Sequence, residues 1–338
     1  MNTQPAATQP IKLGLIGSSG WAEGMYVSAL ASDPRVEIVG VSARNQARLD
    51  ELSAKWNIAN TYTDAHELIA SDVDGVIIAT PDSAHLEYAT AALAAGKHVL
   101  CEKPMALDAH QTQTMLDSAR SAGLVNMVMF TFRFLPVLQQ LRQQVATLGQ
   151  ITDARFEFRQ GYARNNDYFW RLDPAHGTGV VGDLGSHLFD LAAWMLGDFK
   201  ILGANTNNLF HSQIETNEQF TALGQTPAGA AVTFVASMID EMGDTDMEQL
   251  FDFQSPTARL TVRVLYSGPR AGVYTELRSA GETTTTFEPG LQYEHYPSGP
   301  RSFVTAILGQ NVDIPTFADG HRAQWLIDDV LKLVAAKS

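Results

Sequence analysis

Three side chains of this 338-residue sequence, Lys103, Asp183 and His187, have the chemistry needed to interconvert an alcohol and a carbonyl group. Such a reaction needs one group that moves the hydroxyl proton and one donor that stabilises negative charge on the same oxygen. Asp183 and His187 stand four positions apart, so one helix face carries both. A carboxylate beside an imidazole orients the ring and favours its protonated form. We predict that His187 is the acid–base group, that Lys103 hydrogen-bonds the reacting oxygen, and that Asp183 holds substrate and site groups.

Each of these residues also has a structural interpretation. A lysine before a proline, here Pro104, is commonly a surface turn residue, and a helical histidine is commonly a hydrogen-bonded core residue. The sequence leaves open which of Lys103 and His187 carries the decisive proton. Asp190 could have a structural role by capping or pairing, and Arg171 could bind substrate hydroxyls or support the site through an ion pair.

A polar and aromatic loop with Tyr162, Asn166, Tyr168 and Trp170 lies just before Arg171. Aromatic rings stack on sugar faces and amides read hydroxyl groups, so the loop suits a sugar or cyclic polyol; an ordinary surface loop is the alternative. The predicted substrate-binding residues are Lys103, Tyr168, Arg171, Asp183 and His187.

A glycine-containing turn after the first apolar run has the pattern of a phosphate-binding loop. In Gly17-Ser-Ser-Gly-Trp-Ala22, Gly17 takes the tight-turn place and Ala22 the close-packing place of a G-x-G-x-x-G/A fingerprint. Ser19 stands where the second glycine normally lets the backbone approach a pyrophosphate. The N–H groups and dipole of the following helix would face the anion, although an ordinary strand–turn–helix junction is the alternative.

The end of the second apolar run bears on the choice of nucleotide. NAD-type sites place Asp or Glu about 20 residues after the glycine turn, to bond the ribose 2′-hydroxyl. The corresponding residue here is Ala43, flanked by Ser42 and Arg44. Because an arginine pairs with a 2′-phosphate that an acid would repel, we predict NADP(H), with NAD possible. Arg44 as a solvated loop cation is the alternative.

Apolar runs and amphipathic stretches alternate as far as residue 130, which predicts an α/β domain with a doubly wound parallel Rossmann sheet. The predicted strands are Ile11–Ile16, Val36–Val41, Gly75–Ala79, His98–Leu100 and Asn126–Phe130. The predicted helices are Ala22–Leu30, Gln46–Trp56, His85–Ala95 and Ala109–Ala122.

Beyond residue 130 the pattern predicts an α+β domain with a mostly antiparallel open sheet. Its predicted strands are Asp153–Arg159, Ala230–Ser237, Arg259–Leu265 and Val273–Leu277. Its predicted helices are Leu135–Leu148, Leu184–Leu196 and Gly320–Val334. We therefore predict a polar tail over 1–10, a dinucleotide-binding domain over 11–130, and a substrate-binding and oligomerisation domain over 131–338.

The segment from Gly96 to Met105 (GKHVLCEKPM) resembles the signature of the Gfo/Idh/MocA oxidoreductases. Further segments resemble the family in the same order, so that the resemblance spans about residues 11–335: ATPDSAH over 79–85, RFLP over 133–136, Trp170-Arg171, GDLGSHLFD over 182–190, and the stretch from Pro315 to the final helix.

The resemblance implies a catalytic Lys103, Asp183 and His187 set, a Lys103–Pro104 peptide that is often cis, and a carbohydrate-like alcohol or ketone as substrate. It also implies a homodimer or homotetramer formed through the open sheet. Two alternatives remain: a non-catalytic regulatory protein that senses a dinucleotide, or a redox-assisted sugar eliminase or hydrolase. The predicted cofactor-binding residues are Gly17, Ser18, Ser19, Gly20, Trp21, Ser42, Arg44, Thr80, Pro81, Asp82, His85, Glu102 and Lys103.

Composition excludes several partners. The formal net charge of −14 and pI of about 5.0 argue against nucleic acid and anionic membranes as binding partners.

The single cysteine, Cys101, allows no internal disulfide and is expected to be a buried small hydrophobe. We expect a cytoplasmic protein, because neither a leader pattern nor an apolar stretch of about 20 residues is present. We predict no metal, because no Cys/His cluster has zinc-ligand spacing.

Overall fold

A computed structural model describes the chain except for residues 1–8, 166–171, 175–176, 212–215, 291–297 and 337–338. The chain forms two compact units, and both are assembled from separated stretches, whereas the sequence predicts one break near residue 130. The first unit consists of Met1–Glu102, Gln113–Met129 and Tyr296–Phe317. The second unit consists of Lys103–Thr112, Phe130–His295 and Ala318–Ser338.

The first unit contains a six-stranded parallel sheet in the order β3-β2-β1-β4-β5-β6. This order confirms the predicted doubly wound sheet, with its switch point between β1 and β4. The central strands are almost wholly buried, as their continuous apolar runs require. The strands are β1 (Ile11–Ile16), β2 (Val36–Ser42), β3 (Asn60–Tyr62), β4 (Gly75–Ile78), β5 (His98–Cys101) and β6 (Asn126–Val128).

One continuous helical segment follows β1 and contains a π-helical turn: α1 (Gly20–Ala22), η1 (Glu23–Val27) and α2 (Ser28–Leu30). The other helices along this part of the chain are α3 (Gln46–Trp56), α4 (Ala65–Ala70), η2 (Asp82–Ala84), α5 (His85–Ala94) and α6 (Ala109–Ala122). The first unit also includes α10 (Ser298–Ile307), which the sequence analysis did not predict. Arg301 joins α10 to α2 through a hydrogen bond to the carbonyl oxygen of Ala29 at 3.1 Å.

The second unit contains an eight-stranded sheet in the order β14-β13-β12-β11-β7-β10-β9-β8. Only β7 and β10 run parallel; every other neighbouring pair is antiparallel, which confirms the predicted mostly antiparallel sheet. Its strands are β7 (Asp153–Gln160), β8 (Lys200–Asn207), β9 (Gln219–Gln225), β10 (Ala231–Ser237), β11 (Met247–Gln254), β12 (Ala258–Leu265), β13 (Gly272–Ser279) and β14 (Glu282–Pro289).

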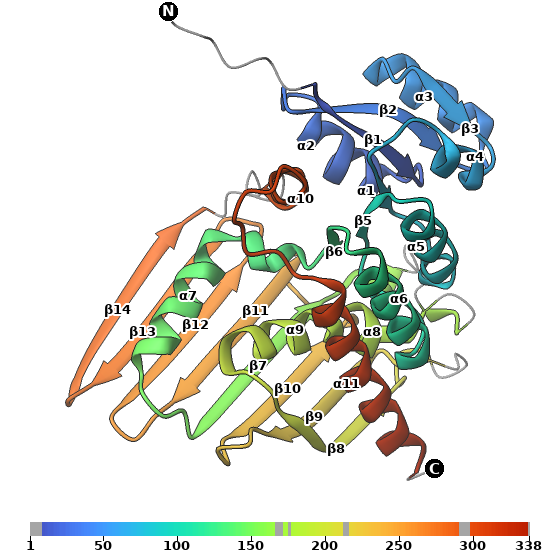
Figure 1. Ribbon diagram of the computed structural model, residues 1–338. Helices are drawn as coiled ribbons and strands as arrows, with labels where there is room; N and C mark the ends of the chain where they lie inside the picture. The colour runs from blue at the N-terminus through green and yellow to red at the C-terminus, as the bar shows by residue number, and fades with distance from the viewer. Residues whose placement is uncertain (1–8, 166–171, 175–176, 212–215, 291–297, 337–338) are drawn as a thin grey trace, which may run out of the picture. The chain divides into compact units, whose positions relative to one another are not determined.

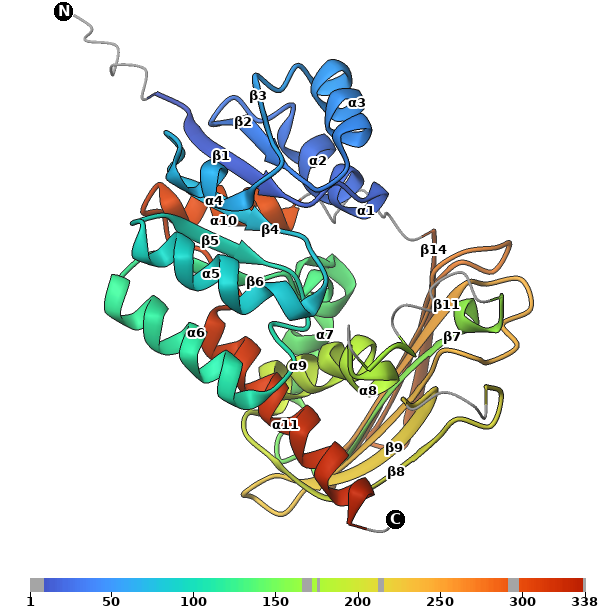
Figure 2. The same cartoon turned by 90° about the vertical axis from the view of Figure 1, so that its right-hand side faces the viewer.

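Four helices of the described chain lie on one face of this sheet (Figures 1 and 2): α7 (Pro136–Thr147), α8 (Gly179–Asp183), α9 (Gly185–Leu196) and α11 (Phe317–Ala335). The same part of the chain also contains the 3-10 helices η3 (Thr131–Phe134) and η4 (Tyr162–Asn165). The core beneath α9 is aromatic: Phe189 contacts Phe234, whose ring stacks on Phe156 of β7.

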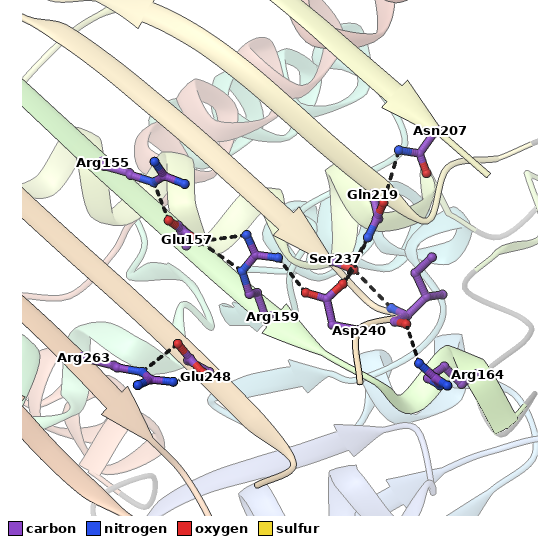
Figure 3. Close-up of polar contacts among 11 residues, drawn as sticks. Arg155, Glu157, Arg159, Arg164, Asn207, Gln219, Ser237, Asp240, Glu248 and Arg263 are labelled. Carbon is purple, nitrogen blue, oxygen red and sulfur yellow. Dashed lines mark hydrogen bonds and ion pairs between the residues drawn. The ribbon is translucent and has the colours of Figure 1, made fainter. Parts of the chain in front are cut away.

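Side chains alternate between the two faces along a strand, so every second residue of these strands points away from the core. We call the face that carries these residues the outer face. It carries paired charges, including Arg155, Glu157, Arg159, Glu248 and Arg263 (Figure 3). Among the described residues, no helix is both long and apolar enough to span a bilayer.

Candidate active site

Lys103 and Asp183 form a direct ion pair in the second unit. Lys103 Nζ donates to Asp183 Oδ1 at 2.7 Å and to the Asp183 carbonyl oxygen at 3.2 Å. The hydroxyl of Tyr162 donates to the other carboxylate oxygen, Oδ2. The side chains of Lys103 and Asp183 retain 14% and 12% exposure, so a small substrate group could reach them.

The backbone has a special feature next to each member of this ion pair. The Lys103–Pro104 peptide is cis. Gly182, next to Asp183, leaves no room for a side chain, because a Cβ there would lie 2.0 Å from Thr178 Oγ1 and 3.5 Å from Pro104 Cγ. The glycine before Asp183 therefore makes room for the Thr178 hydroxyl at the start of α8, whereas a Cβ would make only an ordinary van der Waals contact with Pro104.

The loop before β9 supports the start of α8. The amide of Val181 donates to Asn217 Oδ1 at 3.0 Å. Gly179 adopts φ +64°, and a Cβ there would lie 2.7 Å from the carbonyl oxygen of Asn217. Only glycine meets both conditions without strain.

His187 lies in the first turn of α9, in an aromatic shell. Its ring lies 4.6 Å from that of Phe132, 6.1 Å from that of Phe158 and 6.2 Å from that of Phe130, between centroids. The residue is 5% exposed, and its Nδ1 has no hydrogen-bond partner within the described part of the chain. Burial, and then the nearby Lys103 ammonium, lower the pKa of His187 well below its usual value, which Asp183 opposes.

The sequence analysis expected Asp183 to favour the protonated form of His187, but burial has the larger effect on the pKa of this imidazole. The carboxylate holds Lys103 and Tyr162, and the imidazole is neutral near pH 7 because burial outweighs the attraction of Asp183. The arrangement offers an oriented ammonium beside a neutral imidazole, which suits an uncharged oxygen that gains negative charge during reaction.

Asp190, three residues after His187, is not in this group. Its carboxylate accepts two hydrogen bonds from the Arg133 guanidinium, from Nε at 2.8 Å and from Nη2, and Arg133 also bonds Asp319 at 2.9 Å. Burial raises the pKa of Asp190 to about 6, against the opposing effect of Arg133. The structure thus gives Asp190 the pairing role that the sequence analysis left open.

The predicted phosphate-binding turn closes the carboxyl end of β1. Gly17 adopts φ +125°, and a Cβ there would lie 2.2 Å from the carbonyl oxygen of Ala79. Ser19 caps the next helix, its Oγ accepting from the amide of Ala22 at 3.1 Å. Ala22 is fully buried. These features match the tight-turn and close-packing roles expected of Gly17 and Ala22, with the serine hydrogen still free to donate.

Two arginines follow β2, and only one is engaged. Arg48 bonds the carbonyl oxygen of Ser18 at 2.9 Å and pairs with Glu23 and Glu51. Arg44 is exposed, and its guanidinium has no hydrogen-bond or ion-pair partner among the described residues. Ser42 at the strand end is 2% exposed, and its carbonyl oxygen accepts from the amide of Gly17 at 2.8 Å.

The loop after β4 belongs to the same edge of the sheet. The Oγ1 of Thr80 is buried without a hydrogen-bond partner in the described residues. The Nε2 of His85, a fully buried residue, lies 2.9 Å from the Thr80 carbonyl oxygen and so braces the loop. Asp82 is buried and Pro81 exposed.

Glu102 follows β5 and is held by two aromatic donors. The Trp21 indole and the Tyr26 hydroxyl each donate to Glu102 Oε1 at 2.6 Å. Burial, and then the Glu102 carboxylate, raise the pKa of Tyr26 well above its usual value, so the phenol keeps its proton. Trp21 nevertheless stays 51% exposed beside the glycine turn.

Family models match both parts of the chain. Residues 11–130 match the Gfo/Idh/MocA model described as an oxidoreductase family with an NAD-binding Rossmann fold, and residues 138–254 match the Gfo/Idh/MocA C-terminal domain. The chain belongs to the Gfo/Idh/MocA oxidoreductase family.

Individual relatives of this Gfo/Idh/MocA protein include sugar and diol dehydrogenases. Glucose-6-phosphate 3-dehydrogenase of Bacillus subtilis (strain 168) is 30% identical over 212 residues, which cover 61% of this chain and 59% of that protein. Trans-1,2-dihydrobenzene-1,2-diol dehydrogenase of Macaca fuscata fuscata is 30% identical over 241 residues, which cover 70% of this chain and 69% of that protein. The chain spans only 54–59% of the length of three curated relatives that it matches.

The fold is similar to that of levoglucosan dehydrogenase, solved in complex with NADH. The TM-score is 0.84, with 21% identity and coverage of 98% of each chain.

Several expectations for this Gfo/Idh/MocA chain can now be compared with the structure. Lys103 and Asp183 form an ion pair, and their charges act on the pKa of His187, while the catalytic roles of the three residues stay a prediction. Tyr168 and Arg171, predicted to bind substrate, lie outside the described residues. The sequence analysis did not foresee the bond from Tyr162 to Asp183, and its only signal for this residue was membership of the polar-aromatic loop. Nor did it foresee the phenylalanine shell of His187, since its members come from separate segments.

Proposed function

We propose that this protein is an NADP(H)-dependent dehydrogenase or reductase that acts on a hydroxyl or carbonyl group of a sugar or polyol. One observation carries the proposal: Lys103 Nζ lies 2.7 Å from Asp183 Oδ1, with the buried imidazole of His187 beside them. An alcohol–ketone pair needs both an oxygen-binding donor and a proton-transfer group, and the site supplies both types. The sugar and diol dehydrogenases among the relatives support the substrate class.

The chain's residues fit a nicotinamide dinucleotide on three observations. Gly17 has the positive φ of a tight turn. The amides of Gly20 and Trp21, the first of the helical segment after it, have no hydrogen-bond partner among the described residues, whereas that of Ala22 is capped by Ser19. Thr80 Oγ1 is buried, also without a described partner. When bound, the nicotinamide accepts or supplies the hydride. The residues proposed to hold the dinucleotide are Gly17, Ser18, Ser19, Gly20, Trp21, Ser42, Arg44, Thr80, Pro81, Asp82, His85, Glu102 and Lys103.

Within the second unit, Lys103 would donate a hydrogen bond to the reacting oxygen of the substrate. Asp183 orients that ammonium by accepting one of its hydrogens. His187, neutral because of its burial, would accept the hydroxyl proton during oxidation and return it during reduction. Tyr168 and Arg171 are proposed to bind substrate hydroxyl groups.

The preference for NADP(H) rests on Arg44. Arg48 is engaged by Ser18, Glu23 and Glu51, which leaves Arg44 as the guanidinium available to a 2′-phosphate at the end of β2. The absence of an acidic side chain at Ala43 removes the repulsion that a phosphate would meet.

We also propose a homodimer or homotetramer formed through the outer face. Phe287 there is 48% exposed and stacks on Tyr274 at 4.5 Å. The charges of this face pair with one another, so a second copy of a chain with net charge −14 would meet no large excess of like charge. These pairs are Arg155–Glu157, Arg159–Asp240, Arg259–Asp252 and Arg263–Glu248.

The decisive experiment titrates purified protein with NADPH and NADH and then screens sugars, polyols and ketoses for absorbance change at 340 nm, the wavelength at which reduced nicotinamide absorbs. We expect tighter NADPH binding, and turnover that falls at least tens of fold in Lys103→Ala and in His187→Ala, because a positioned acid–base group contributes about 10²–10⁴-fold. Near-normal turnover in either folded variant would count against the assignment. Product formation without net cofactor change would support the eliminase or hydrolase alternative.

A further inference from the structure

We propose that Tyr162 is a positioning residue of the Lys103–Asp183 pair, and that the polar network of the outer face holds Tyr162 in place. The proposal deepens the proposed function, on which it rests for the role of the pair. The observation that carries it is that Tyr162 and Lys103 bond the two different oxygens of the Asp183 carboxylate. Tyr162 donates to Asp183 Oδ2, while Lys103 donates to Oδ1 at 2.7 Å.

A single donor would leave the carboxylate of Asp183 poorly oriented, because the terminal torsion of an aspartate side chain is broad. Two donors on its two oxygens fix the plane of the group. The ammonium of Lys103 sits on a flexible stem and takes its direction from its acceptor. Tyr162 therefore sets the direction of the Lys103 ammonium indirectly, by orienting the carboxylate of Asp183.

Tyr162 owes its own place to the connection that follows β10. Tyr162 opens η4, and η4 contacts that connection at three points. The amide of Ala163 donates to the carbonyl oxygen of Met238 at 3.0 Å. Arg164 pairs with Glu241 at 3.2 Å and donates to the carbonyl oxygen of Ile239 at 3.4 Å. Any displacement of this connection would displace η4 and, with it, the phenol.

Asp240 anchors the connection to three strands of the outer face (Figure 3). Its Oδ2 accepts from Arg159 of β7 at 2.6 Å. Its Oδ1 accepts from Ser237 of β10 at 2.6 Å and from Gln219 of β9 at 3.0 Å. A chain of contacts thus runs from the sheet through Asp240 and η4 to Asp183.

The outer face also supplies a matched control. Glu248 pairs with Arg263 at 2.8 Å on the same face, and none of the contacts described for the connection after β10 involves it. Tyr274 is the control for loss of a phenol, because its hydroxyl donates to the backbone of Arg270 at 3.0 Å. Glu248→Gln and Tyr274→Phe therefore remove similar groups without touching η4.

The first test is spectroscopic and needs no turnover. In protein labelled with ¹³C at the tyrosine ζ carbon, the resonance missing from Tyr162→Phe identifies Tyr162. We expect that resonance to move in Asp183→Asn and in Asp240→Ala, and to stay in place in Glu248→Gln and Tyr274→Phe. A Tyr162 resonance unchanged by Asp183→Asn would overturn the proposal, whatever the activity of the protein.

The second test is kinetic and uses a double-mutant cycle. Tyr162→Phe should lower kcat about tenfold, the effect of losing a hydrogen bond to a charged group, with the sugar KM changed less than about twofold. In the Asp183→Asn background the same change should lower kcat less than about twofold, because its effect passes through Asp183. Equal losses in both backgrounds, or no loss in either, would overturn the positioning role. A wild type without turnover would instead refute the proposed function, and the spectroscopic result would still decide the contact.

Discussion

Gly17→Ala should destabilise the first unit strongly, because two separate costs act at this position. The residue adopts φ +125°, which side chains with a Cβ rarely adopt, and the new Cβ would lie 2.2 Å from the carbonyl oxygen of Ala79. Backbone hydrogen bonds hold both Gly17 and Ala79 in place, so neither residue can move to relieve the contact. The amide of Gly17 bonds Ser42 at 2.8 Å, and the amide of Ala79 bonds Ile16 at 2.8 Å.

The magnitude follows from these two costs. An unfavourable backbone region costs about 1–3 kcal/mol. A close contact that forces backbone to shift costs about 1–3 kcal/mol more. Their sum of roughly 2–6 kcal/mol is a large share of the 5–15 kcal/mol that stabilises a typical protein.

Urea unfolding followed by tryptophan fluorescence would measure this loss. Gly24→Ala is the matched control, because no heavy atom lies within 4 Å of a Cβ at that position and alanine is the better helix former by about 1 kcal/mol. A loss below about 1 kcal/mol for Gly17→Ala, within the range of ordinary substitutions, would refute the steric reasoning.

Gly20 is equally open to a Cβ, so Gly20→Ala should fold normally. Weaker NADPH binding by the Gly20 variant would then indicate that the nucleotide approaches the backbone closely at this residue.

Three further predictions concern other charged or titratable groups. Arg44→Ala should weaken NADPH binding about ten- to hundredfold in a fluorescence titration and leave NADH binding nearly unchanged, because only the former loses a charge-assisted bond; equal losses would contradict the 2′-phosphate role. The pKa of His187 is lower in the folded than in the unfolded protein, so its contribution to the free energy of unfolding should be complete above about pH 6.5 and be lost as the pH falls below it. Chemical denaturation across pH 5–8 should show this dependence for wild type and a weaker one for His187→Gln, in which burial still lowers the pKa of His98. Asp190→Asn should cost about 3–5 kcal/mol, because it removes the carboxylate that accepts two hydrogen bonds from the buried Arg133 and leaves that guanidinium with Asp319. Turnover at low temperature should be largely kept; lost turnover at unchanged stability would place Asp190 in the site instead.

Sequence patterns anticipated the elements of the first unit well, because their signals are local. The run Ile11–Ile16 and the helix Gln46–Trp56 have the predicted bounds. The strand Asn60–Tyr62 was missed since three residues carry too little periodicity. In the second unit, Glu282–Pro289 was missed because it is exposed on both faces and lacks an apolar alternation.

The pairing of side chains was less predictable than the elements. The motif around Lys103 indicated a role for that residue, but its partner in the structure is a carboxylate 80 positions away. The i, i+4 spacing of Asp183 and His187 favoured a mutual interaction, yet the carboxylate bonds Lys103 and Tyr162. Competing donors from other segments decided the outcome, and spacing within one segment contains no information about them.

The sequence by itself determined most of the longer elements of the first unit, the glycine turn after β1 and the non-acidic end of β2. It also determined the presence of a lysine, an aspartate and a histidine in the family's motifs. These properties are local, since they depend on side-chain periodicity and backbone sterics over a few residues. Only the tertiary structure decided that His187 is neutral, that Asp190 pairs with Arg133, and that Tyr162 bonds Asp183. Charge state and hydrogen-bond choice depend on burial and on neighbours brought together from distant segments, and folding alone determines both.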